Sequence, residues 1–74
     1  MDLSIVDYLL VCLAEQPRNV AMVMRTAGYT QDQISEAWTE ARAAMLTESS
    51  GLGQDRLTDA GRVRAAELVQ EFVR

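Results

Sequence analysis

The segment LTESSGLGQDRLTDAGRVRAAEL, residues 46–68, restricts the fold more than any other part of the chain. Two short runs, residues 45–49 and 54–58, lie on either side of a loop that holds Gly51 and Gly53. Short runs joined by a glycine-containing loop are typical of a β-hairpin. The segment therefore predicts an antiparallel hairpin over residues 46–58.

A closing helix is expected directly after this hairpin. Thr58 or Asp59 can cap its first turn, Leu57 can point inward from the second strand, and Gly61 allows the hairpin to pack close to it. The helix runs toward the end of the chain and has a broad apolar face, formed by Val63, Ala65, Ala66, Leu68, Val69, Phe72 and Val73.

Three helices are predicted before the hairpin. The first is capped by Ser4, with Asp7 in its first turn, and ends near Gln16 before Pro17. The second is capped by Asn19 and ends near residue 27, with Gly28 in the left-handed position. The third starts with the capping box of Thr30 and Gln33. Its core stripe, at spacings of three and four, is Ile34, Ala37, Trp38, Ala41 and Met45.

These elements describe one domain over residues 1–74, mainly α with a small β-hairpin. The length of the chain is near the lower limit for a domain that folds alone. The methionines are expected to fill the core, as adaptable apolar side chains at positions 22, 24 and 45. Trp38 is expected in the core as well.

Two stretches resemble a known family. Residues 20–44 resemble a helix-turn-helix, in which Val23, Ala27, Gly28, Ile34 and Ala37 take the apolar and tight-turn positions. Met24 departs from that pattern, which usually has a small residue there. Residues 46–68 look like the wing and following helix of winged-helix bacterial transcription regulators, and RLTDAGR is the more specific part. Together the two stretches span about two thirds of the chain.

The resemblance implies a winged helix-turn-helix domain that binds DNA. It implies that the third helix lies in the major groove, and the candidate contacts on it are Thr30, Gln31, Gln33, Ser35, Thr39 and Arg42. It also implies phosphate or minor-groove contacts from Gln54 and Arg56 on the wing and from Arg18 and Asn19 at the start of the second helix. The function expected on this basis is that of a small transcription regulator.

The charge distribution favours a second interpretation. The net charge is −4, and residues 1–50 contain seven acidic residues against three arginines. Asp32, Glu36 and Glu40 lie on the helix that would face DNA, where they would repel phosphates. The alternative is an acidic winged-helix module that binds protein, as an adaptor or an inhibitor, including a phage-type mimic of nucleic acid.

The residue inventory argues against catalysis, cofactors and metals. The chain has no His and no Lys, and its only cysteine, Cys12, lies among apolar residues, so no nucleophile has an evident base. No phosphate-binding loop is present, and a thiolate–imidazole metal site is excluded. The longest apolar run has only seven residues and the start lacks a basic signal region, which predicts a cytoplasmic protein.

A homodimer is expected because the first and last helices have more apolar surface than one small core can cover. The residues predicted at this interface are Ile5, Tyr8, Val69, Phe72 and Val73.

Overall fold

The computed structural model describes residues 3–51 and 54–72 of the 74-residue chain. This part forms four helices and one two-stranded antiparallel sheet. In chain order they are α1 (Ile5–Glu15), α2 (Val20–Thr26), α3 (Gln31–Ala43), β1 (Thr47–Ser49), β2 (Asp55–Leu57) and α4 (Asp59–Phe72). The mainly helical fold with a small hairpin that the sequence predicts is confirmed at this level.

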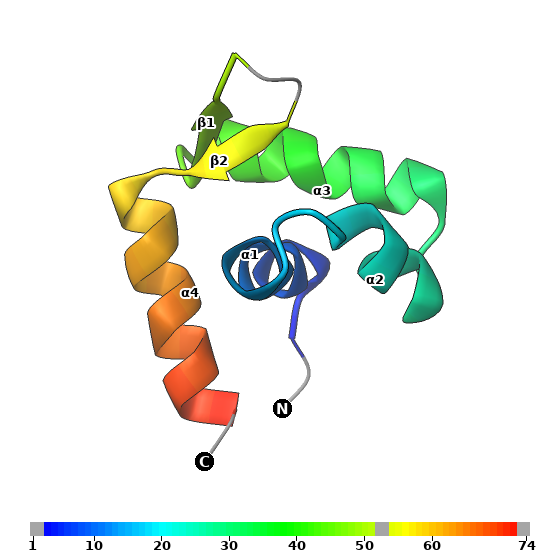
Figure 1. Ribbon diagram of the computed structural model, residues 1–74, viewed down its shortest axis with the longest axis horizontal. Helices are drawn as coiled ribbons and strands as arrows, with labels where there is room; N and C mark the ends of the chain where they lie inside the picture. Colours follow the sequence, from blue (N-terminus) through cyan, green and yellow to red (C-terminus); the bar gives the residue numbers. More distant parts are fainter. Residues whose placement is uncertain (1–2, 52–53, 73–74) are drawn as a thin grey trace.

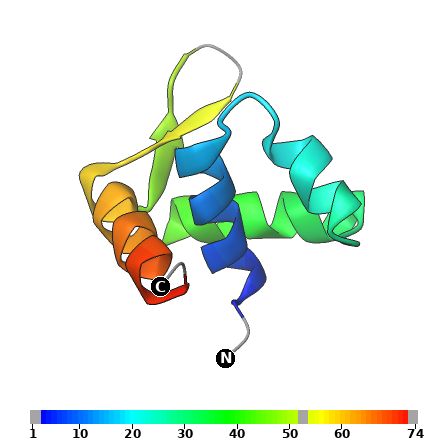
Figure 2. The same ribbon diagram turned by 60° about the horizontal axis from the view of Figure 1, so that its bottom comes forward.

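Helix α1 is the centre of the molecule. It packs against α2, α3 and α4, and Figure 2 shows it between α4 and α2 with α3 crossing behind it. This position explains why α1 is apolar on almost all sides. The buried apolar side chains of the core are Leu9, Leu10, Cys12, Leu13, Val20, Met24, Ile34, Ala37, Ala41, Ala65 and Leu68.

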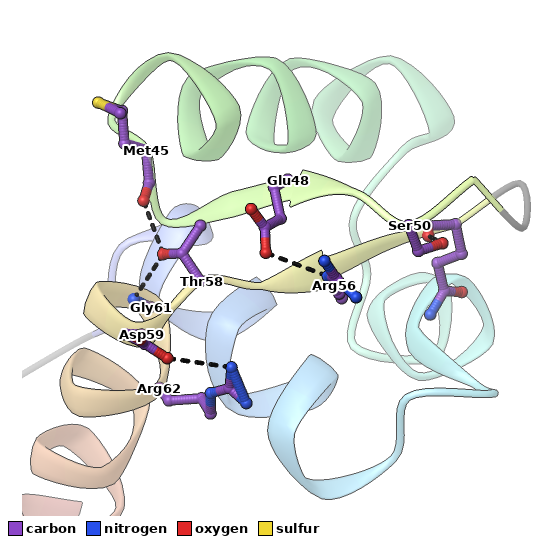
Figure 3. Close-up of polar contacts among 9 residues, drawn as sticks. Met45, Glu48, Ser50, Arg56, Thr58, Asp59, Gly61 and Arg62 are labelled. Atoms are coloured by element: carbon purple, nitrogen blue, oxygen red, sulfur yellow. Dashed lines mark hydrogen bonds and ion pairs between the residues drawn. The ribbon is translucent and has the colours of Figure 1, made fainter.

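The predicted caps of α1, α3 and α4 are confirmed. The Ser4 hydroxyl accepts a hydrogen bond from the Asp7 amide (3.1 Å). Thr30 and Gln33 form a complete capping box, with bonds of 3.2 and 2.8 Å. The Thr58 hydroxyl accepts from the Gly61 amide (3.0 Å) and donates to the Met45 carbonyl (2.7 Å), as Figure 3 shows.

The predicted cap of α2 is only half right. Asn19 does precede the helix, but its side chain makes no capping hydrogen bond, because its backbone angles (φ −124°, ψ 20°) lie outside the extended region that caps adopt.

Helices α2 and α3 end in the same way. After α2, the Gly28 amide donates to the Arg25 carbonyl and the Tyr29 amide to that of Met24; after α3, the amides of residues 45 and 46 donate to the carbonyls of residues 42 and 41. This is the Schellman pattern, which places one residue in the left-handed region. That residue is Gly28 (φ 104°) after α2, as predicted, and Met45 (φ 61°) after α3.

The expected burial of two methionines is wrong. Met45 is 74% exposed, because α3 ends at Ala43 and the left-handed turn takes Met45 off the helical stripe. Met22 is 63% exposed, whereas Met24 is fully buried.

The hairpin packs on α4 through Gly61. Thr47 is paired with Leu57, Glu48 with Arg56 and Ser49 with Asp55, within the predicted range. A β-carbon at position 61 would lie 2.0 Å from the Leu46 carbonyl oxygen. The side-chain-free surface of Gly61 is therefore required for this contact. Figure 1 shows that the hairpin lies beside the C-terminal part of α3.

Candidate functional site

A groove runs between α3 and the hairpin. One part, of about 460 Å³, is lined by Trp38, Thr39, Arg42, Ala43 and Asp55. It shares Trp38, Arg42 and Asp55 with a second hollow of about 330 Å³, which extends toward α2 along Val20, Ala21 and Gln54. We call the two together the α3–hairpin groove.

An ion pair crosses this groove. The Arg42 Nε donates to Asp55 Oδ2 (2.9 Å), and an Arg42 terminal nitrogen donates to Asp55 Oδ1. The hydrogen bonds to Asp55 and its charge raise the pKa of Arg42 above its already high ordinary value. The Arg42 side chain is 61% exposed and that of Asp55 only 11%. This two-bond contact links α3 to β2.

A second contact ties the hairpin to the turn between α1 and α2. The Gln54 side-chain amide donates to the Pro17 carbonyl (2.6 Å). Arg18 and Asn19 directly follow Pro17 and are exposed. The turn before α2, the hairpin and α3 therefore surround the same groove.

One side of α3 faces this groove. Gln31, Ser35, Trp38 and Arg42 recur at spacings of four, three and four, so they form one row along the helix. The Gln31 amide donates to the Ser35 hydroxyl (3.4 Å), and the Thr39 hydroxyl donates to the Ser35 carbonyl (3.1 Å). Trp38 packs against the core but is only partly buried, so the expectation of a core tryptophan holds for just part of its surface.

The acids of α3 lie elsewhere than the sequence interpretation assumed. Two residues are about 200° apart around an α-helix, so Glu40 and Arg42 point in nearly opposite directions. Glu36 and Glu40 line a separate groove of about 210 Å³ together with Gln33, Ile5 and Tyr29. The third acid, Asp32, lies in the first turn of the helix, and all three acids are exposed. Gln33, a predicted DNA contact, lies on the acidic side.

Arg56 is separated from Arg42 by the pleat of β2. Side chains alternate along a strand, so Arg56 points away from the face on which Asp55 meets Arg42. Its Nε donates to Glu48 on β1 (3.0 Å; Figure 3), in a pair that is exposed on both sides. Of the three arginines predicted to contact DNA, only Arg18 has no carboxylate within ion-pair distance among the residues that the structure describes.

Among the predicted dimer residues that the structure describes, Ile5 and Val69 line separate grooves. Ile5 lines the groove that contains Glu36 and Glu40. Tyr8 packs edge-on against Tyr29, with ring centroids 5.5 Å apart. Val69 lines a different groove of about 360 Å³, between α4 and the end of α1. Val73 and the Phe72 side chain lie outside the described part of the chain.

An ion pair that the sequence did not suggest joins α1 to α4. Two Arg64 nitrogens donate to the two carboxylate oxygens of Asp7, at 3.1 and 3.3 Å. The two residues are 57 positions apart, so no local spacing could have revealed the pair.

A further hollow of about 550 Å³ lies between the end of α1 and the hairpin, and Pro17, Gln54, Arg56 and Arg62 are among the residues that line it. Burial raises the pKa of the Cys12 thiol, which disfavours the reactive thiolate form. Within residues 3–51 and 54–72, no cluster of acidic or cysteine side chains could hold a metal ion, and no helix is long and apolar enough to span a membrane. No known protein family, curated protein or solved structure matches this chain.

Proposed function

We propose that this chain is a winged helix-turn-helix protein that binds duplex DNA and acts in the cytoplasm as a small transcription regulator. In this proposal, α2, the Gly28 turn and α3 are the helix-turn-helix, and the β1–β2 hairpin is the wing. The order of three helices, hairpin and closing helix is the one that the resemblance implies.

The observation that carries the proposal is the division of α3 into two sides. Thr39 and Arg42 line the α3–hairpin groove, while Glu36 and Glu40 line the groove on the other side of the helix. A helix in the major groove would therefore present Gln31, Ser35 and Thr39 to the bases with fewer acids in front of them. Amide and hydroxyl side chains of this kind form hydrogen bonds with base edges.

The affinity is expected to be modest. Arg42 and Arg56 are each paired with a carboxylate, and the net charge is −4. Among the arginines predicted to contact DNA, Arg18 is then the one without a carboxylate partner in the described residues, and phosphate neutralisation supplies most nonspecific affinity.

Fluorescence anisotropy with a labelled duplex, at about 50 and about 200 mM salt, tests the proposal. Arg18→Ala should weaken binding to all sequences equally and lower the salt slope by about one. Arg64→Ala is the matched control, because it removes the same charge from α4, where Arg64 pairs with Asp7 (3.1 Å). Absence of binding at the lower salt concentration would reject the proposal.

The second candidate is an acidic winged-helix module that binds protein, as an adaptor, an inhibitor or a mimic of nucleic acid. The pairing of Arg42 and Arg56 with carboxylates favours it, because it leaves the α3 and hairpin side nearly without free positive charge. This function is preferred if the folded protein binds no duplex but gains nonspecific binding in the double variant Glu36→Arg/Glu40→Arg.

A further inference from the structure

The Arg42–Asp55 pair differs from the other ion pairs of the described residues. Its carboxylate is the least exposed, at 11%, against 20% for Asp7, 47% for Glu48 and 100% for Asp59. Its arginine nevertheless remains 61% exposed. A nearly buried carboxylate thus holds an arginine that is accessible in an open groove.

The geometry of the pair is one that phosphate can also adopt. The guanidinium uses Nε and one terminal nitrogen, each on a different carboxylate oxygen. Arginine binds phosphate through the same planar fork. A carboxylate and a phosphate cannot both receive these two directed hydrogen bonds.

We propose that Arg42 is a phosphate-binding residue of the DNA interface and that Asp55 is its internal competitor, which occupies the guanidinium in the free protein. The proposal rests on the proposed DNA-binding function. A backbone phosphate of the duplex must displace the Asp55 carboxylate before it can bind Arg42.

Displacement has a cost that selects among DNA sites. It breaks two directed hydrogen bonds between charged groups, and the Asp55 carboxylate, which is 11% exposed while Arg42 is in place, must then be solvated by water instead. The residue before Asp55, Gln54, is hydrogen-bonded through its side chain to the Pro17 carbonyl. This contact restrains the movement of Asp55 when Arg42 leaves it. A duplex that makes good contacts along α3 offsets this cost, and a poor site does not. The competitor therefore reduces nonspecific binding.

Asp55→Asn tests the inference, because asparagine keeps the size of the side chain and removes its charge. In the anisotropy assay, the variant should bind duplex on the order of tenfold more tightly than the parent. Its salt slope should be steeper by about 0.9, the value for one additional phosphate contact. Glu67→Gln is the matched control: it removes one negative charge from an exposed position of α4, a helix outside the proposed interface, and should change affinity less than about twofold.

A double-mutant cycle separates competition from a general field effect. If Asp55 acts by occupying Arg42, the gain from Asp55→Asn disappears in an Arg42→Ala background. If the gain persists there, Asp55 acts only as a nearby negative charge and the inference is overturned.

An NMR titration of the parent protein tests the same inference without a substitution, in case Asp55→Asn destabilises the hairpin. The Nε–H signals of Arg42 and Arg64 are followed by ¹⁵N NMR during titration with the duplex. Arg64 is the internal control, because it has a similar two-bond pair with Asp7 away from α3. A shift of the Arg42 signal without one of Arg64 supports the inference. If the protein is saturated with DNA and the Arg42 signal does not change, the inference about Asp55 is overturned but the proposed DNA binding stands. If neither the parent nor Asp55→Asn binds duplex at low salt, the proposed function is rejected as well.

Discussion

At the scale of single residues, Gly28 and Met45 have the same role at the ends of α2 and α3, but the conformational energy of the left-handed backbone differs between them. Both have a positive φ, at 104° and 61°. The left-handed region is unfavourable by roughly 1–2 kcal/mol for a residue with a β-carbon and is open to glycine. The end of α3 is therefore strained where the end of α2 is not.

Met45→Gly should stabilise the protein by about 1 kcal/mol, because it removes this strain and loses little buried surface from a side chain that is 74% exposed. Gly28→Ala should do the opposite by a similar amount. Urea unfolding measures both. A destabilised Met45→Gly variant would mean that the methionine makes stabilising contacts in spite of its exposure.

Gly61→Ala should destabilise the protein by about 3 kcal/mol or more, since the new methyl group would lie 2.0 Å from the Leu46 carbonyl oxygen. In an ordinary helix interior the same substitution stabilises by about 1 kcal/mol. The sign of the change in a thermal or urea unfolding experiment therefore decides whether the contact between hairpin and α4 requires glycine.

At the scale of elements, α3 joins the core to the candidate interface. Ile34, Ala37 and Ala41 are fully buried, whereas Trp38 is partly buried and forms a wall of the α3–hairpin groove. The hairpin lies against this helix through Asp55, so the groove exists only when both elements are in place.

Trp38→Ala should cost about 2 kcal/mol, below the range of about 3–5 kcal/mol for a fully buried aromatic residue, because part of the ring already contacts solvent. Urea unfolding, followed by circular dichroism, measures it. A loss of 4 kcal/mol or more would show that the ring is as deeply buried as the sequence pattern alone suggested.

At the scale of the whole molecule, stability should depend on alkaline pH. Burial raises the pKa of the Cys12 thiol, and it raises that of the Tyr8 hydroxyl with smaller contributions from Cys12 and Tyr29. In the unfolded chain these groups ionise at about 8.5 and about 10. The unfolded state therefore loses protons first, and the free energy of unfolding should fall as the pH rises above about 8.5. Thermal unfolding between pH 7 and pH 10 checks this, and in Cys12→Ala the fall should begin at higher pH.

The proposed homodimer is also a property of the whole molecule. Val69 lines the groove between α4 and α1, while Val63 on the same helix is 59% exposed away from it. Sedimentation equilibrium should give the mass of two chains for the parent and for Val63→Asp, and the mass of one chain for Val69→Asp. A single-chain mass for the parent would reject the dimer.

The sequence by itself determined the features that depend on neighbours within a few residues. The hydrogen bonds that form the caps at Ser4, Thr30 and Thr58 and the turn at Gly28 span only three to five positions, so residue type and spacing are sufficient to predict them. The hairpin was predictable for the same reason, since its turn is local.

Only the tertiary structure decided how the charged side chains are partnered and which side of α3 borders the hairpin. Arg42 meets Asp55 across 13 positions, Gln54 meets Pro17 across 37, and Arg64 meets Asp7 across 57. The sequence placed Arg42, Thr39 and Gln54 among the candidate contacts, and the helical period sets Glu40 opposite Arg42, but it did not show which of the two sides borders the hairpin. Such pairings depend on the angles at which helices pack, and those angles follow from the shape of the whole core instead of from any local pattern.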